Sequence, residues 1–294
     1  MRPEQLKKTV QEAFDRLVRD IEAGKSQQLK DYLRMMGRFT NYSFGNMLLI
    51  LMQRPDAEQV AGFWTWKKLG RSVKKGERGI AILAPMVYHR EIPLEGEEGQ
   101  EPKTKEVEYL AGFRTAWVFD VSQTEGRPLA EFSQVKGEPG QYLEMLKAYV
   151  AVKGIKLDYS LIPGQTLGLS CGGRIVIKAG MTAAEEFSTL THELAHEMVH
   201  RTQESKPFDR KRKELEAEAI AYVVARGIKL DTNSASADYI QLYNGDKVAL
   251  QESLERIQKT ASEILWALKN SGTYVTADYR QEETTVKHTI AQAA

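Results

Sequence analysis

The sequence contains 294 residues, of which 42% are hydrophobic and 28% are charged. This balance is typical of a folded globular protein and excludes an intrinsically disordered chain. The formal net charge is only +1, so bulk charge indicates no nucleic-acid partner, and any nucleic-acid surface must be a local basic patch.

The first half of the chain mixes helical and strand patterns. Apolar residues at helical spacing predict helices over 4–22, Ser26–Met36 and Asn41–Met52. An aromatic and apolar run, Val60–Trp66, precedes a basic turn, Lys67–Arg78, and strands are predicted at Gly79–Val87 and Tyr109–Val121. Residues 91–108 contain seven Glu and almost nothing to bury, which predicts a solvated loop or hairpin tip.

The segment Gln134–Gly140 is rich in glycine and is the best linker candidate. Beyond it, helices are predicted at Gln141–Val152, Glu185–Arg201, Lys211–Arg226 and Ala249–Lys269, and strands at Ile155–Tyr159 and Arg174–Ile177. We therefore expect an α+β protein with two domains: a mixed helix and small-sheet domain over 1–133, and a second domain over 141–294. The polar final twenty or so residues are expected to fray.

Other sequence features concern the location of the protein. No apolar run approaches the roughly 20 residues that span a bilayer, and the N-terminus lacks the hydrophobic core of a signal peptide. Cys171 is the only cysteine, so neither an intrachain disulfide nor a cysteine zinc site can form. We expect a cytoplasmic protein without a membrane partner, in which Cys171 is a small buried residue.

A metal-site motif lies on the predicted helix Glu185–Arg201. His192 and His196 are four residues apart, so their imidazoles share one helix face and can hold one ion. Glu193 lies beside the open coordination position, where a carboxylate can take a proton from zinc-bound water. Thr182 and Glu185 have the spacing of a capping box for this helix. The motif predicts a zinc peptidase site with Glu193 as the general base.

The third ligand is expected from the following helix. Glu214 and Glu218 share a face at i,i+4, whereas Glu216 points elsewhere. We assign Glu214 as the ligand and Glu218 as a partner that orients a ligand histidine; the reverse assignment stays open. This set predicts one Zn²⁺ per chain, which manganese or cobalt could replace.

Residues around this motif complete the expected site. The apolar segment Gly173–Lys178 is placed where zinc peptidases have the edge strand that pairs with a bound peptide. His200 lies one turn further along the histidine face, and we expect it to support the site or simply to pack. Tyr222 and Tyr239 are both conceivable oxyanion donors, and the sequence does not choose between them.

A second candidate site combines aromatic and basic residues. Between residues 60 and 90, seven Lys or Arg stand against one acid. Aromatic faces can stack on unpaired bases and cations can follow the phosphates of single-stranded DNA. The alternative is a core of aromatics with a solvated hairpin of lysines, which spacing alone favours about equally. The candidate DNA-binding residues are Trp64, Trp66, Lys67, Lys68, Arg71, Lys74, Lys75 and Arg78.

Several motifs together resemble one known family. The segments Asn41–Asn46, Gln53–Pro55, Phe63–Arg71, Val73–Glu77 and Val118–Thr124 resemble the N-terminal domain of ArdC-type antirestriction proteins. The elements His192–His196 and Glu214–Glu218 are similar to the zincin-like domain of the same family, which is distantly related to the ImmA/IrrE metallopeptidases. The similar segments occur in the expected order over most of the chain.

The resemblance implies a single-stranded DNA-binding domain followed by a zincin-like metallopeptidase domain. Such proteins are carried by mobile elements and help incoming DNA escape host restriction. A protein substrate would be part of the restriction machinery or a regulator. Two other functions are compatible with the sequence: a regulator that cleaves a repressor, as ImmA/IrrE-like proteins do, and a module that shields DNA and uses its metal only structurally.

Overall fold

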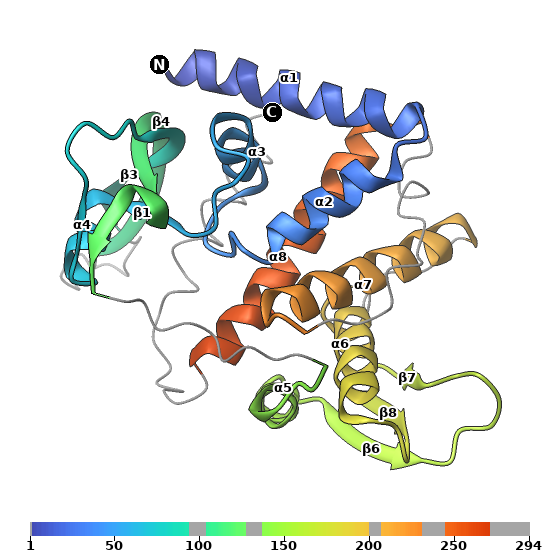
Figure 1. Cartoon of the computed structure of the whole chain (residues 1–294). Helices are drawn as coiled ribbons and strands as arrows, with labels where there is room; N and C mark the ends of the chain where they lie inside the picture. The colour runs from blue at the N-terminus through green and yellow to red at the C-terminus, as the bar shows by residue number, and fades with distance from the viewer. Residues whose placement is uncertain (1, 94–103, 128–136, 200–206, 231–244, 271–294) are drawn as a thin grey trace, which may run out of the picture.

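The computed structural model describes residues 2–93, 104–127, 137–199, 207–230 and 245–270, which form an α+β fold (Figure 1). The helices in these ranges are α1 (Pro3–Glu22), α2 (Ser26–Met36), α3 (Phe44–Gln53), α4 (Phe63–Lys68), α5 (Gln141–Val152), α6 (Ala183–Val199), α7 (Pro207–Gly227) and α8 (Lys247–Asn270). The strands are β1 (Val60–Gly62), β2 (Arg71–Val73), β3 (Ile80–Pro93), β4 (Thr104–Asp120), β5 (Thr124–Gly126), β6 (Lys156–Ser160), β7 (Gly168–Ser170) and β8 (Arg174–Lys178). The linker candidate and the C-terminal tail fall partly or wholly outside the described ranges.

Strands β3 and β4 form a long antiparallel hairpin, and β1 pairs with the other side of β4. The hairpin confirms the expectation of strands on either side of the acidic segment 91–108, although both strands extend into that segment. Its tip, 94–103, lies outside the described residues.

Helix α3 docks on the outer edge of β3 through two amide side chains. Asn46 donates to Leu83 O and accepts from Leu83 N, both at 2.8 Å. Gln53 likewise donates to Ala81 O at 2.8 Å and accepts from Ala81 N at 2.9 Å. Each amide therefore replaces the backbone partner that a neighbouring strand would give β3. The helix begins three residues later than predicted, because Ser43 accepts from Asn46 N and caps it.

The predicted basic turn Lys67–Arg78 is wrong as a single turn. Helix α4 extends to Lys68, and β2 follows and pairs with β5. The reason lies in hydrogen bonds from distant residues. Gln123 donates to Glu77 Oε2 and Arg78 O, and its carbonyl accepts from Lys74 N. These bonds order a segment whose local composition alone indicates a loop.

The second half contains a sheet in the order β6–β8–β7, with β8 parallel to β6 and antiparallel to β7. The expectation that Gly173–Lys178 forms the edge strand is therefore wrong. Strand β8 is central, and its buried residues Ile175 and Ile177 reflect that place. The edge strand is β7, whose three residues are too short a run to give a strand pattern in the sequence.

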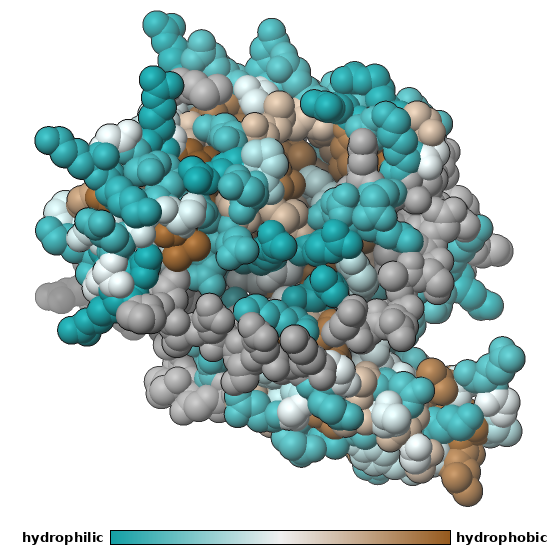
Figure 2. Space-filling model, in the orientation of Figure 1, coloured by the Kyte–Doolittle hydropathy of each residue, from teal (hydrophilic) through white to brown (hydrophobic). Residues whose placement is uncertain are grey.

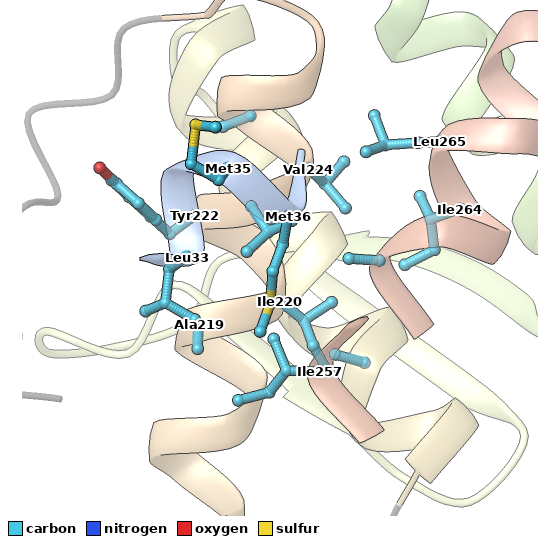
Figure 3. Close-up of a cluster of buried hydrophobic side chains, with 14 of the residues drawn as sticks. Leu33, Met35, Met36, Ala219, Ile220, Tyr222, Val224, Ile257, Ile264 and Leu265 are labelled. Atoms are coloured by element: carbon cyan, nitrogen blue, oxygen red, sulfur yellow. The ribbon is translucent and has the colours of Figure 1, made fainter. Parts of the chain in front are cut away.

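Helix α7 lies between α6 and α8 and contributes to a core shared by both halves of the chain. Figure 3 shows the cluster, which brings together α2 (Leu33, Met35, Met36), α7 (Ala219, Ile220, Tyr222, Val224) and α8 (Ile257, Ile264, Leu265). Gly37 permits the close approach of α2 and α7, since a Cβ there would lie 2.8 Å from Val223 O. The division at 133 and 141 stays a prediction. Within the described ranges, no helix is long and apolar enough to cross a membrane.

Candidate metal centre

Helix α6 is fixed at its start by a capping box. Glu185 N donates to Thr182 Oγ1 at 3.3 Å, and Thr182 N donates back to Glu185 Oε2 at 2.9 Å, as the sequence predicts. One apolar face, with Phe187, Leu190 and Leu194, is fully buried. The opposite face consequently presents His192 and His196 toward α7.

The three predicted ligand atoms lie close together. His192 Nε2 is 3.1 Å from His196 Nε2, and each of these nitrogens is 3.5 Å from Glu214 Oε2. These side chains form a cluster able to hold a metal ion. Because tetrahedral ligands about 2.0–2.1 Å from zinc are about 3.3–3.4 Å apart, the spacing fits zinc with little movement. Imidazole and carboxylate donors also suit other divalent transition metals.

The electrostatics of the triad are those of a site that exchanges a proton for a metal. Burial disfavours charged His192, but its hydrogen bond to Glu214 and the charges of Glu193 and Glu218 outweigh burial and raise its pKa. Hydrogen bonds from both histidines hold the pKa of Glu214 well below its ordinary value. A divalent ion would replace the proton between these groups.

Glu193 lies in the same cleft, a cavity of about 460 Å³ lined by β7, α6 and the start of α7. Burial raises the pKa of Glu193, and the charges of the two histidines only partly oppose this. Gly168 of β7 packs directly against this carboxylate, since a Cβ there would lie 2.7 Å from Glu193 Cγ. Strand β7 therefore covers Glu193 on the side away from α7.

Glu197 is a residue that the sequence analysis missed. It is buried, and its carboxylate accepts from Ser170 Oγ at 2.7 Å, Gly172 N at 2.8 Å and Gly173 N at 2.6 Å. These bonds attach the β7–β8 turn to α6, one residue after His196. The only feature of the sequence that could have indicated this role is the position of an acidic residue directly after the second histidine of the motif.

Glu216 fixes the orientation of α7. It is 1% exposed and accepts hydrogen bonds from Arg212, Ser253 and Arg256. The prediction that Glu216 points away from the site is confirmed. With that face of α7 bound to α8, Glu214 and Glu218 face the histidines of α6. Glu218 adds negative charge near His192, while Glu214 supplies the nearest oxygen.

The remaining predicted residues fall in different places. Cys171 is exposed in the β7–β8 turn, so the expectation of a buried cysteine is wrong. Tyr222 is 5% exposed and belongs to the α2–α7–α8 cluster (Figure 3). His200 and Tyr239 lie outside the described residues.

The basic-aromatic segment divides into exposed and structural residues. Trp66 is 2% exposed and donates to Phe119 O, so it presents no face to a base. Arg71 is engaged with Thr124 Oγ1 and with the carbonyls of Thr124 and Arg127. Both side chains therefore have structural partners within the protein, and their role in DNA contact stays a prediction. In contrast, Trp64 is 71% exposed and stacks edge-on with Phe63.

The other members of the predicted set are exposed: Lys67, Lys68, Lys74, Lys75 and Arg78. Lys67 Nζ lies over the Trp64 ring, 5.6 Å from its centroid. Trp117 of β4 is a further aromatic that sequence reasoning missed; it is 51% exposed and packs beside Gly79. Figure 2 shows apolar atoms among hydrophilic ones in the region of α4 and β1.

Comparison with known proteins gives three kinds of similarity. Residues 7–119 match the family model described as the N-terminal domain of anti-restriction factor ArdC. An uncharacterized Bacillus anthracis protein, pXO2-81, is 28% identical over 303 residues, covering 89% of this chain and 51% of that protein. The chain thus spans about half the length of this curated relative.

Two crystal structures of the antirestriction ArdC protein from the R388 plasmid are also similar. The metal-free structure is 21% identical, with a TM-score of 0.49, and the alignment covers 89% of this chain and 98% of that one. The Mn(II)-bound structure is 20% identical, with a TM-score of 0.48, covering 90% and 98%.

Proposed function

Because residues 7–119 match the N-terminal domain of the anti-restriction factor ArdC, we propose that the chain is a member of that family and has a function with two parts. The N-terminal part binds single-stranded DNA, and the second half is a zincin-like, metal-dependent peptidase. Together they protect the incoming DNA of a mobile element from host restriction. DNA binding would bring the peptidase to restriction machinery assembled on the same DNA.

The observation that carries the peptidase proposal is the arrangement of four side chains in one cleft. His192, His196 and Glu214 would supply three ligands to one ion, the number that catalytic rather than structural zinc sites take from the protein. Glu193 lines the same cleft. This arrangement disfavours the alternative of a purely structural metal.

In this proposal the residues of the cleft have distinct roles in peptide hydrolysis. His192, His196 and Glu214 would hold the zinc ion, whose Lewis acidity would polarise a carbonyl and lower the pKa of a water molecule to about 7. Glu193 accepts a proton from the attacking water at a carboxylate oxygen and delivers it to the leaving amine as the C–N bond breaks. The raised pKa of Glu193 suits a group that both takes and returns a proton. Glu218 keeps the surroundings of His192 negative.

The test is peptide cleavage by zinc-loaded wild-type protein and by Glu193→Gln, followed by mass spectrometry of a mixed peptide library. We expect cleavage to fall at least about a hundredfold in the variant, because a general base contributes that much or more, while bound zinc is unchanged. Equal cleavage by both proteins would assign the reaction to a contaminant or to another residue and would refute the proposed role.

For DNA binding, the proposed contact residues are those that the surface exposes. Trp64 and Phe63 offer ring faces, and Lys67, Lys68, Lys74, Lys75 and Arg78 offer charge, with Trp117 as a further candidate. Trp66 and Arg71 instead support this surface from beneath, through their bonds to Phe119, Thr124 and Arg127. Lys74 also donates to Ser122 O, which holds it near the other cations.

Fluorescence anisotropy with a labelled oligo(dT) probe tests this interface. Trp64→Ala should weaken binding about tenfold or more, because stacking on one aromatic contributes about 1–3 kcal/mol per base. Trp266, which is 47% exposed on α8, is the matched control, and Trp266→Ala should have no effect. Affinity should also fall steeply with salt. Binding that is insensitive to both salt and Trp64→Ala would remove this surface from consideration.

A further inference from the structure

The two walls of the metal cleft differ in charge. The β7 side contributes Gly168, Leu169, Ser170 and Gly172, none of which carries a charge. The α7 side contributes Arg210, Lys213 and Glu214. Arg210 and Lys213 are three residues apart on the helix, so they share a face, and Glu214 follows directly. The cations therefore lie on the same wall as the ligand carboxylate.

Two carboxylates, Glu193 and Glu214, line the cleft, and Glu218 lies near His192. A divalent ion at the histidines would offset much of their negative charge. Arg210 and Lys213 on the α7 wall could then attract an anionic group. A guanidinium adds a planar fork that binds carboxylates in a bidentate manner.

The β7 wall favours a peptide over a nucleic acid as the occupant. No described strand pairs with the outer edge of β7, and such an edge can add an extended peptide strand through backbone hydrogen bonds. Leu169 of β7 is 45% exposed, and Leu167, which directly precedes the strand, is 43% exposed. Figure 2 shows apolar atoms at this outer end of the sheet. A nucleic acid would gain little from a wall that lacks cations.

We propose that Arg210 and Lys213 form a specificity subsite that selects peptide segments carrying an acidic side chain near the bond at the metal. The segment lies between them and the apolar edge strand β7, so the preferred substrate combines an acidic residue with apolar neighbours. This inference rests on the proposed peptidase function, and it adds the class of substrate to it.

The experiment uses zinc-loaded full-length protein and three labelled peptides of about ten residues with the same Ala/Leu frame. The peptides carry two central Asp, two Asn or two Lys. Anisotropy reports binding, and mass spectrometry of the same samples reports cleavage. We expect the Asp peptide to bind at least about tenfold more tightly than the Asn peptide. Arg210→Glu and Lys213→Glu should abolish that preference and favour the Lys peptide.

Lys211→Glu is the matched control, because Lys211 is exposed on the same helix and does not line the cleft; it should leave the preference intact. Equal affinity for the Asp and Asn peptides, no binding of any peptide, or an equal loss with Lys211→Glu would overturn the subsite. A matching loss of oligo(dT) affinity in Arg210→Glu and Lys213→Glu would also overturn the subsite, because the two cations would then bind phosphate.

Binding preference without cleavage would support the subsite and contradict the peptidase. Cleavage without a binding preference would support the peptidase and contradict the subsite.

Discussion

The carboxylate of Glu197 accepts hydrogen bonds from a serine hydroxyl and two glycine backbone amides, all in the segment that joins β7 to β8. A buried charged group can be stable without a cation if its oxygens are satisfied by such donors. Because Glu197 follows His196 directly, these bonds tie the turn between β7 and β8 to the helix that carries the metal ligands.

Replacing Glu197, which is buried, by alanine should destabilise the protein by about 2 kcal/mol, because the two backbone N–H groups of Gly172 and Gly173 and the Ser170 hydroxyl would lose their acceptor. Urea unfolding measures this change. Ser170→Ala, which removes only one of the three bonds, should cost clearly less. If both variants unfolded at the same urea concentration as the wild type, the turn would not depend on Glu197.

A second buried carboxylate, Asp120, predicts a pH effect on stability. Burial raises its pKa, but hydrogen bonds from Ser122, Glu58 and Gln59 outweigh burial, and the pKa is lowered from its ordinary value of 3.8. Because the folded state favours the charged form, this stabilisation is complete above the ordinary pKa and is lost as the pH falls through the lowered value.

Asp120→Asn should therefore lower the free energy of unfolding by about 2 kcal/mol near neutral pH. The difference from the wild type should shrink at a pH well below the ordinary carboxyl pKa of 3.8. Urea unfolding at the two pH values measures both quantities. A difference of the same size at both would mean that the lost stability comes from altered packing rather than from the charge.

At the scale of elements, the site depends on the close packing of β7 against α6. Gly168 has no room for a methyl group, since a Cβ would lie 2.7 Å from Glu193 Cγ and 2.8 Å from Thr189 Cγ2. Gly168→Ala should displace Glu193 and lower cleavage by about tenfold to a hundredfold, with zinc content unchanged. Gly62→Ala, where the nearest atom is Thr65 Oγ1 at 4.0 Å, should leave cleavage unaffected. Full activity in Gly168→Ala would show that Glu193 need not occupy its observed position.

Three motifs of the family resemblance also acquire a physical reason at this scale. Asn46 and Gln53 of α3 satisfy the edge of β3. Asp120 accepts from the segment before β1, and Gln123 donates to the segment before β3. Their side chains form the frame on which α4 presents Trp64. The structure therefore separates residues of the same motif segments into supporting ones, such as Trp66, and exposed ones, such as Lys67.

At the scale of the whole molecule, the shared core connects the N-terminal helices to the helix that carries Glu214. Helix α2 packs on α7, and Gln258 of α8 donates to Phe39 O at 3.2 Å. We expect both halves of the chain to unfold in one transition, and Gly37→Ala to destabilise both. Hydrogen exchange in α3 and α8 would measure this. Faster exchange confined to one of the two helices would indicate independent domains.

The sequence was sufficient to predict those structures that depend on a local pattern of residues. The helix periodicities, the capping box of Thr182 and Glu185, and the i,i+4 spacing of His192 and His196 predict structures that the fold contains. It was insufficient to predict burial, side-chain partners and strand order, which depend on long-range contacts. The burial of Trp66, the engagement of Arg71 and the order of β7 and β8 depend on partners more than ten residues away. Spacing could not reveal them.

The most direct test of the account is the metal content of the purified protein by elemental mass spectrometry, for the wild type, His192→Ala, Glu214→Ala and Glu218→Gln. The geometry predicts about one zinc per chain in the wild type, its loss in the first two variants and its retention in Glu218→Gln. Zinc retained by Glu214→Ala and lost by Glu218→Gln would reverse the ligand assignment. No metal in the wild type after zinc is offered would contradict the metal centre itself.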